Sequence, residues 1–238
     1  MKTERLLTAF SELTELVARL RGPNGCPWDA LQTDTTIKMY LLEEAYEVLD
    51  AIENGSPRAV CQELGDLLFQ IIFLSSLAQD RGEFNLVDVL ENITEKMISR
   101  HPHVFGSLKV ENTQDVSDNW ERIKRAEKGS PKKISDLLDE VPINMPALQR
   151  SHRLGQRAAK AGFESETSVE ILQKIKEEFK NLEECIQLNN KDGLSELTGD
   201  LFFNLVNLTR HCGLNSENLL REANRKFIKH IREVEDNK

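Results

Sequence analysis

Two runs of carboxylates contain residue types that can bind a divalent cation. They are "LLEEAYEVLDAIE" (41–53) and, further along the chain, "ELGD" (63–66). If the first run is helical, Glu43 and Glu47 fall opposite its apolar arc, and Glu44 lies at the margin. That arrangement is typical of a solvated helix face, so the first run alone does not indicate a site.

The second run lies in a more apolar setting. Glu63 and Asp66 are one turn apart in "AVCQELGDLLFQIIFLSSLA" (59–78), which is apolar nearly all round and therefore typical of a buried helix. Buried carboxylates are unfavourable unless they meet cations or hydrogen-bond donors. Gly65 lowers the helix propensity between them, and a close backbone approach would account for it. We therefore expect the two runs to converge on a bound cation.

The ligand types favour Mg²⁺, with Mn²⁺ as an alternative. Both cations take oxygen ligands, and Mg²⁺ is typically completed by water and substrate phosphates. A di-iron carboxylate bundle would need Glu-x-x-His on its helices, and no histidine of this chain has a glutamate three residues before it. Two antiparallel helices could aim two carboxylates each at the cation, namely Glu44, Glu47, Glu63 and Asp66.

Helices must position these carboxylates, because helical periodicity runs along the whole chain and strand signals are nearly absent. The abundance of Leu, Glu, Lys and Ala favours the same state. We therefore predict an all-α fold. The predicted helices span 3–20, 36–54, 58–81, 86–100, 115–127, 146–160, 168–189, 193–212 and 216–236.

The two halves of the chain resemble each other. "GDLLFQIIFL" (65–74) matches "GDLFFNLVNL" (199–208), and the same offset of 134 residues sets "LLEEAYEVL" (41–49) against "IKEEFKNLE" (175–183). Several matches in one order indicate a duplication rather than a chance similarity of leucine-rich helices. We therefore expect two tandem helical bundle units.

A proline-containing stretch separates the two expected units. "GSPKKISDLLDEVPINMP" (129–146) holds three prolines and is typical of a linker. We predict an N-terminal domain over 1–128, a linker over 129–145 and a C-terminal domain over 146–238.

The carboxylate motifs and their neighbours resemble one protein family. EExxE (43–47), followed after fifteen residues by ExxD (63–66), resembles the signature of MazG-type nucleoside triphosphate pyrophosphohydrolases. "NGCPWD" (24–29) and "RHPHVF" (100–105) look like the N-terminal half of a two-domain member, and "GDLFFNLVNLTRH" (199–211) looks like its second half. The resemblance covers nearly the whole chain.

The resemblance implies an all-α, obligately dimeric protein that uses Mg²⁺. Its expected reaction is the hydrolysis of nucleoside triphosphates, as NTP or dNTP, to the monophosphate and pyrophosphate in nucleotide-pool house-cleaning. The implied metal ligands are Glu44, Glu47, Glu63 and Asp66, and Glu43 would support them or orient the attacking water. The alternative is a catalytically decayed, dimeric helical module that binds nucleotides or a protein partner in a regulatory role.

Cationic and aromatic residues complete the expected substrate site. Lys96 and Arg100 are four residues apart on one helix face; alone they are typical of solvated residues, and the resemblance assigns them to phosphate binding. Trp28 of "CPWD" could stack on a base or belong to the core. His101 and His103 could donate to phosphate, but a turn around the intervening proline is the preferred interpretation.

The second half keeps only part of the motif. Glu177 and Glu178 stand where Glu43 and Glu44 do, Asp200 matches Asp66, and Lys226 matches Lys96. The glutamates at 47 and 63 are replaced by asparagine at 181 and leucine at 197, and the arginine at 100 is replaced by histidine at 230. We therefore expect the first half to hold the working site and the second half to be a degenerate copy that packs, dimerises or regulates.

The composition excludes several other classes of partner. The net charge is −9, which disfavours nonspecific binding to nucleic acid or to anionic membranes. No apolar run is expected to span a membrane, and the N-terminus has no signal-peptide core. The four cysteines are far apart and are typical of reduced thiols, so we expect a cytoplasmic protein.

Overall fold

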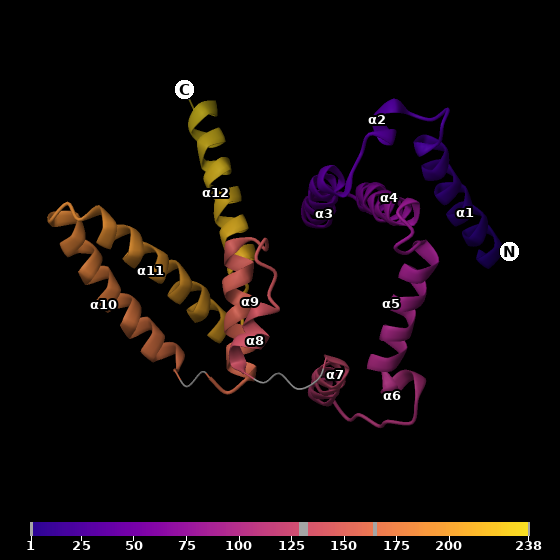
Figure 1. Ribbon diagram of the computed structural model, residues 1–238. Helices are drawn as coiled ribbons and strands as arrows, with labels where there is room; N and C mark the ends of the chain where they lie inside the picture. Colours follow the sequence, from indigo (N-terminus) through magenta and orange to yellow (C-terminus); the bar gives the residue numbers. More distant parts are fainter. Residues whose placement is uncertain (1, 129–132, 164–165, 238) are drawn as a thin grey trace. The chain divides into compact units, whose positions relative to one another are not determined.

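The computed structural model describes residues 2–128, 133–163 and 166–237, and Figure 1 gives their arrangement. The described residues form helices and no strand, so the all-α prediction is confirmed. The chain divides into two compact units, Met1–Lys124 and Arg125–Lys238. The boundary falls within helix α7 (Thr113–Lys128).

The first unit is built around a helical hairpin. Helix α4 packs against α3 on one side and α1 on another, and Figure 1 shows α3 and α4 next to each other. Two very short helices, each beginning at a proline, were not predicted, because four residues are too few to show helical periodicity. The helices are α1 (Lys2–Arg21), α2 (Pro27–Ala30), α3 (Asp34–Asn54), α4 (Pro57–Asp80), α5 (Leu86–Arg100) and α6 (Pro102–Phe105).

Local sequence explains why α3 and α4 form this hairpin. Thr33 caps the start of α3 in a capping box, and Ser56 followed by Pro57 starts α4. Between the two helices, a Cβ on Gly55 would lie 2.7 Å from the Ala51 carbonyl oxygen, so the turn needs glycine. A connection this short makes consecutive helices antiparallel neighbours, which places the two carboxylate runs opposite each other.

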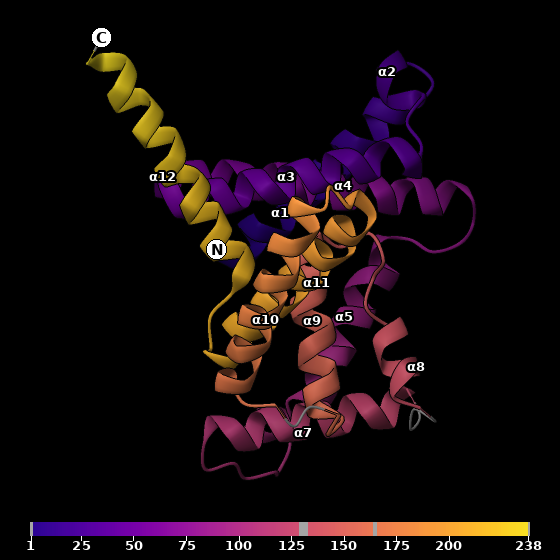
Figure 2. The ribbon, with the colours of Figure 1, turned by 90° about the vertical axis from the view of Figure 1, so that its left-hand side faces the viewer.

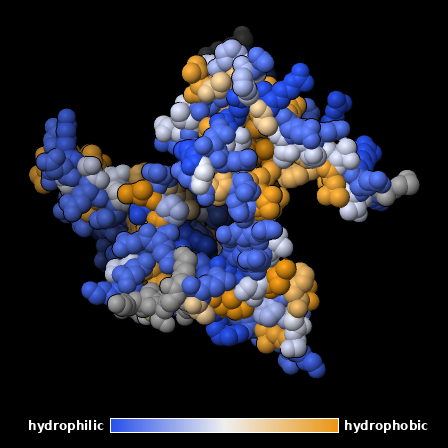
Figure 3. Space-filling model, turned by 45° about the vertical axis from the view of Figure 1, so that its right-hand side comes forward, coloured by the Kyte–Doolittle hydropathy of each residue, from blue (hydrophilic) through white to orange (hydrophobic). Residues whose placement is uncertain are grey.

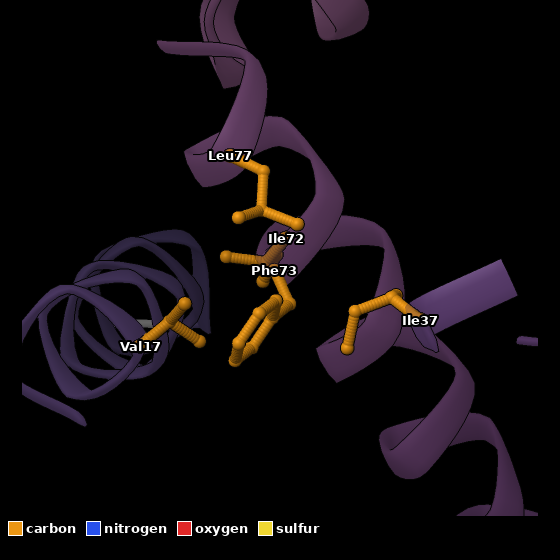
Figure 4. Close-up of a cluster of buried hydrophobic side chains, with 5 residues drawn as sticks. All are labelled: Val17, Ile37, Ile72, Phe73 and Leu77. Carbon is orange, nitrogen blue, oxygen red and sulfur yellow. The ribbon is translucent and has the colours of Figure 1, made fainter. Parts of the chain in front are cut away.

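The core of the first unit lies where α1, α3 and α4 meet. Figure 4 shows the Phe73 ring of α4 pointing into the space between Val17 of α1 and Ile37 of α3. Ile72 and Leu77 of α4 complete the buried cluster. The core holds the hairpin against α1, and it thereby fixes the helices that carry the carboxylates.

Only part of α4 is buried, contrary to the prediction of a helix covered on all sides. Leu64, Leu68 and Ile71 are 50%, 36% and 38% exposed, and Asp66 is also exposed. Gly65 has no neighbouring atom within 4 Å of a Cβ built on it, so the expected close backbone approach is wrong within this chain. Neighbouring helices cover the sides of α4 and leave this face open, and Figure 3 shows that apolar residues also lie on the surface of the molecule.

Helix α4 also corrects the expectation that no apolar run is long enough to span a membrane. Its 24 residues include an apolar stretch of 18 residues that meets that criterion by length and composition. A core helix of a soluble protein meets the same criterion, and one face of α4 packs in such a core.

The second unit repeats the helical hairpin. Figures 1 and 2 both show α10 and α11 running side by side, and Ile171, Ile175 and Leu201 form the buried cluster between them. Helix α9 packs on α11 and α12. The helices are α8 (Ile134–Asp139), α9 (Ala147–Lys160), α10 (Ser168–Gln187), α11 (Lys191–His211) and α12 (Ser216–Asp236).

The stretch predicted as a linker is partly helical. Residues 129–132 lie outside the described residues, but α8 falls inside the predicted span of 129–145. Arg157 of α9 holds α8 through an ion pair with Glu140 at 3.2 Å and a hydrogen bond to the Leu137 carbonyl oxygen. Helix α8 was not predicted, because the prolines and lysines of the stretch 129–146 indicated a linker. The predicted domain limits stay a prediction.

Candidate active site

Three carboxylates from α3 and α4 gather at one point of the first unit. Glu44 of α3 and Glu63 and Asp66 of α4 each offer an oxygen, and these oxygens lie within 4.8 Å of one another. The spacing of the α4 pair places both carboxylates on one face, one turn apart. Hard divalent cations take oxygen ligands from such sets, so this carboxylate group fits Mg²⁺ or Mn²⁺.

Burial and mutual repulsion raise the pKa values of two members of the carboxylate group. The pKa of Glu44 is raised above its ordinary value, first by burial and then by the negative charges of Asp66 and Glu47. The pKa of Glu63 is raised by partial burial and then by the same two neighbours. Among the described residues, no lysine or arginine forms an ion pair with the group. A bound cation would relieve this repulsion.

The two remaining glutamates of the motif differ in position. Glu47 borders the carboxylate group, since its negative charge acts on both Glu63 and Glu44 and raises their pKa values. Glu43 is exposed on α3, and no contact within the described chain brings it to the group. Glu43 therefore stays a prediction as a supporting or water-orienting residue.

Gln70 connects the carboxylate group to the core. It is 8% exposed, and its Nε2 donates a long hydrogen bond of 3.5 Å to Oε1 of Glu44. An amide donor beside a partly buried carboxylate favours the charged form, so this contact opposes the repulsion from Asp66 and Glu47. Gln70 lies one helical turn after Asp66 in the sequence, but its residue type alone did not indicate a role.

A pocket of about 210 Å³ lies beside Gln70. It is lined by Trp28, Asp29, Gln32, Ile37, Tyr40, Phe69, Gln70 and Phe73. Trp28 lines this pocket and is 64% exposed. The alternative of a core tryptophan is therefore wrong within this chain. The sequence missed the lining glutamine at 32 and the tyrosine at 40, because short helix α2 and the start of α3 meet there only in the folded unit.

The expected phosphate-binding residue Arg100 and its neighbour His101 both contact Trp120. The Arg100 guanidinium lies over the Trp120 ring at 5.4 Å, and His101 meets the same ring edge-on at 5.1 Å. Nδ1 of His101 is also 2.6 Å from the Met97 carbonyl oxygen. No contact among the described residues joins Arg100 or half-buried Lys96 to the carboxylate group. These contacts hold His101 in the fold, and the roles expected for His101 and His103 stay predictions.

The second unit keeps the hairpin without the metal-binding geometry. Glu178 of α10 accepts a hydrogen bond of 2.6 Å from Asn204 of α11, and Glu177 accepts one from Gln173 on its own helix. Asp200 and Lys226 are exposed. Within the part of the chain that the structure describes, α10 and α11 hold no group of three close ligand residues like the one between α3 and α4.

Known proteins match this chain over nearly its whole length. The family model of the MazG nucleotide pyrophosphohydrolase domain matches residues 32–105, which include all the motif carboxylates of the first unit. Nucleoside triphosphate pyrophosphohydrolase of Escherichia coli (strain K12) is 41% identical over 232 residues, covering 96% of this chain and 88% of that protein. Nucleoside triphosphate pyrophosphohydrolase/pyrophosphatase MazG of Thermotoga maritima is 38% identical over 227 residues, covering 95% and 86%. The chain therefore belongs to the MazG family of nucleotide pyrophosphohydrolases.

Proposed function

We propose that this protein hydrolyses nucleoside triphosphates, as NTP or dNTP, to the monophosphate and pyrophosphate in a Mg²⁺-dependent reaction. The observation that carries the proposal is the convergence of Glu44, Glu63 and Asp66 within 4.8 Å. Relatives of similar length are named nucleoside triphosphate pyrophosphohydrolases, which supports this substrate class. The four free cysteines agree with the proposed cytoplasmic location, and house-cleaning of the nucleotide pool is the proposed role.

The carboxylates would act by holding the cation and the water. When bound, Mg²⁺ neutralises a triphosphate and polarises its α-phosphoryl group. Glu44, Glu63 and Asp66 would hold it, and Glu47, which borders them, would be the fourth ligand. Glu43 would orient the water, whose oxygen bonds to the α-phosphorus as the bond from phosphorus to the bridging oxygen breaks. Positioning and charge stabilisation would supply most of the rate enhancement.

The pocket beside Gln70 is the proposed place for the base. It adjoins the carboxylate group through the Gln70–Glu44 contact, and Trp28 and Tyr40 offer aromatic surface for stacking. A base seated there would leave its triphosphate to reach towards the carboxylates. We keep Lys96 and Arg100 as the proposed phosphate contacts.

A homodimer is the proposed assembly. Many apolar side chains remain exposed on α3, α4 and α5, and large exposed apolar areas in soluble proteins commonly mark interaction surfaces. They include Leu42, Tyr46, Leu49 and Ile52 of α3, Leu64, Leu68 and Ile71 of α4, and Val87, Leu90 and Ile93 of α5. Light scattering during gel filtration would give twice the chain mass if these faces pair.

The second unit is proposed to have lost catalysis. In this unit, Glu178 accepts a hydrogen bond from Asn204, and the counterparts of Glu47 and Glu63 are missing. The second unit would therefore pack, dimerise or regulate. If the first unit were also inactive, the chain would be a helical module that binds nucleotides or a protein partner. The intact carboxylate group favours the enzyme.

Incubation with a panel of NTPs and dNTPs separates the two functions. With Mg²⁺ present, we expect pyrophosphate and the monophosphate, and none when the cation is chelated. Release of orthophosphate alone would contradict the proposed bond cleavage. If no nucleotide gave any product, the enzymatic function would be contradicted and the binding module favoured. Calorimetry with the same nucleotides would then measure their binding.

A further inference from the structure

Two buried carboxamides line the pocket beside the carboxylate group. Gln32 is 9% exposed and Gln70 is 8% exposed, and both border the pocket. Their nitrogens are already used: Nε2 of Gln32 donates to the Trp28 carbonyl oxygen at 3.1 Å, and Nε2 of Gln70 donates to Glu44 at 3.5 Å. Because carbonyl and carboxylate oxygens only accept hydrogen bonds, each amide is held with its nitrogen towards its partner.

The amide oxygens of these two glutamines, in contrast to the nitrogens, make no hydrogen bond among the described residues. Oε1 of Gln32 and Oε1 of Gln70 are both buried and neither has a hydrogen-bond partner among the described residues. Buried polar atoms in proteins are nearly always paired, so an unpaired acceptor needs an explanation such as a ligand. Two such acceptors, carried by glutamines that border one pocket, would be paired by a ligand that supplies N–H or O–H donors.

The remaining lining describes the shape of that ligand. Trp28, Tyr40 and Phe69 give the pocket aromatic walls, which suit a flat ring. A volume of about 210 Å³ is below the range of roughly 300–1,000 Å³ that is usual for drug-sized ligands. The pocket therefore suits one planar heterocycle with hydrogen-bond donors on its edge.

We propose that Gln32 and Gln70 select nucleobases that carry an exocyclic amino group, an inference that rests on the proposed function. Guanine, adenine and cytosine each present at least two N–H donors through that group, which matches two acceptors. Hypoxanthine, uracil and thymine present one on the corresponding edge. A base with one donor leaves a buried glutamine oxygen unpaired, and sites built to hydrogen-bond a group discriminate strongly against analogues that lack it.

Two nucleotide pairs test this selection in the unaltered protein. GTP and ITP differ only by the 2-amino group, and CTP and UTP differ at the 4-amino group. We expect kcat/KM to favour GTP over ITP, and CTP over UTP, by at least about tenfold. Equal kcat/KM values within both pairs would overturn the selection and leave the proposed function intact, whereas no pyrophosphate from any of the four would contradict the proposed function itself.

Substitution of Gln32, which makes no hydrogen bond to the carboxylate group, tests whether this glutamine selects the base. Gln32→Met is close to isosteric and removes the acceptor, so the GTP/ITP ratio should fall towards one through a higher KM for GTP, with kcat nearly unchanged. Asn204→Met in the second unit is the matched control and should leave the ratio as it was. A Gln32→Met protein that melts like the wild type and keeps the full ratio would overturn the assignment.

Discussion

Asn204 donates a hydrogen bond of 2.6 Å to Glu178 across α10 and α11, and this pair occupies the place that Gln70 and Glu44 hold across α4 and α3. Each pair is 26 residues apart in sequence, and the offset between the pairs is the 134 residues of the internal repeat. An amide on the second helix of the hairpin thus faces a glutamate on the first in both units. The contact persists in the unit that has lost the counterparts of Glu47 and Glu63, so it has a structural use apart from any cation.

Removing that glutamate should have opposite consequences in the two units. Glu178→Ala leaves the buried Asn204 amide without its partner, and we expect a loss of about 1–3 kcal/mol in the free energy of unfolding with little change in turnover. Glu44→Ala should abolish turnover with a smaller loss of stability, because it also removes repulsion. Urea unfolding followed by circular dichroism, together with a pyrophosphate assay, checks both; the reverse pattern would contradict the assignment of roles.

Stability without metal should depend on pH through the carboxylate group. The pKa values of Glu44 and Glu63 are raised in the folded state, so the folded chain binds more protons than the unfolded chain above pH 4.5. The contribution of these groups to stability is therefore present at low pH and is lost as the pH rises through the raised values. Melting temperatures measured with a chelator should show this decline, and Glu63→Gln should make it shallower.

Added Mg²⁺ should reverse that dependence, because the ligands must be deprotonated to bind it. The increase in melting temperature on adding Mg²⁺ should grow from pH 5 to pH 7.5, and it should be absent in Glu63→Gln. An increase of equal size at both pH values would show that the cation binds elsewhere.

Lys96 provides a test of phosphate binding with its repeat counterpart as the control. Lys96→Ala should raise KM by roughly ten- to hundredfold, since a hydrogen bond to a charged group contributes about 1.5–3 kcal/mol. Lys226→Ala, in the matching position of the second unit, should leave KM unchanged. Steady-state kinetics with one good substrate measures both KM values. Equal increases in KM for the two substitutions would contradict the assignment of phosphate binding to the first unit.

The core residue Phe73 offers a test of the packing that holds the hairpin. It is 1% exposed, so Phe73→Ala should cost about 3–5 kcal/mol of stability. Phe203 of α11 is 43% exposed and serves as the matched control, for which we expect a change of less than about 1 kcal/mol. Denaturant midpoints measure both, and a larger effect at Phe203 would mean that partner contacts dominate stability.

The long helices could be predicted from sequence because their periodicity is local. The prediction for 86–100 coincides with α5, and the hairpin helices differ from the predictions by one or two residues at their ends. The short helices α2, α6 and α8 could not be predicted, since four to six residues carry no periodic signal.

The carboxylate site was predictable to a similar degree. The spacing within each run put Glu44, Glu63 and Asp66 on facing helices, and the structure brings them together. What the sequence could not give is the pocket, because Gln32 and Gln70 come from elements that meet only after α2 and α4 are packed. The full burial expected for α4 was wrong because hydrophobicity alone does not tell a core face from a face left exposed in one chain.

One measurement tests the central claim that the first unit holds the working site. Pyrophosphate release from a nucleoside triphosphate with Mg²⁺ should be lost in Glu63→Gln, with circular dichroism and melting close to those of the wild type. Asp200→Asn, at the position of the second unit that matches Asp66, should retain most of the activity. A protein in which Asp200→Asn abolishes pyrophosphate release while Glu63→Gln is tolerated would contradict the account.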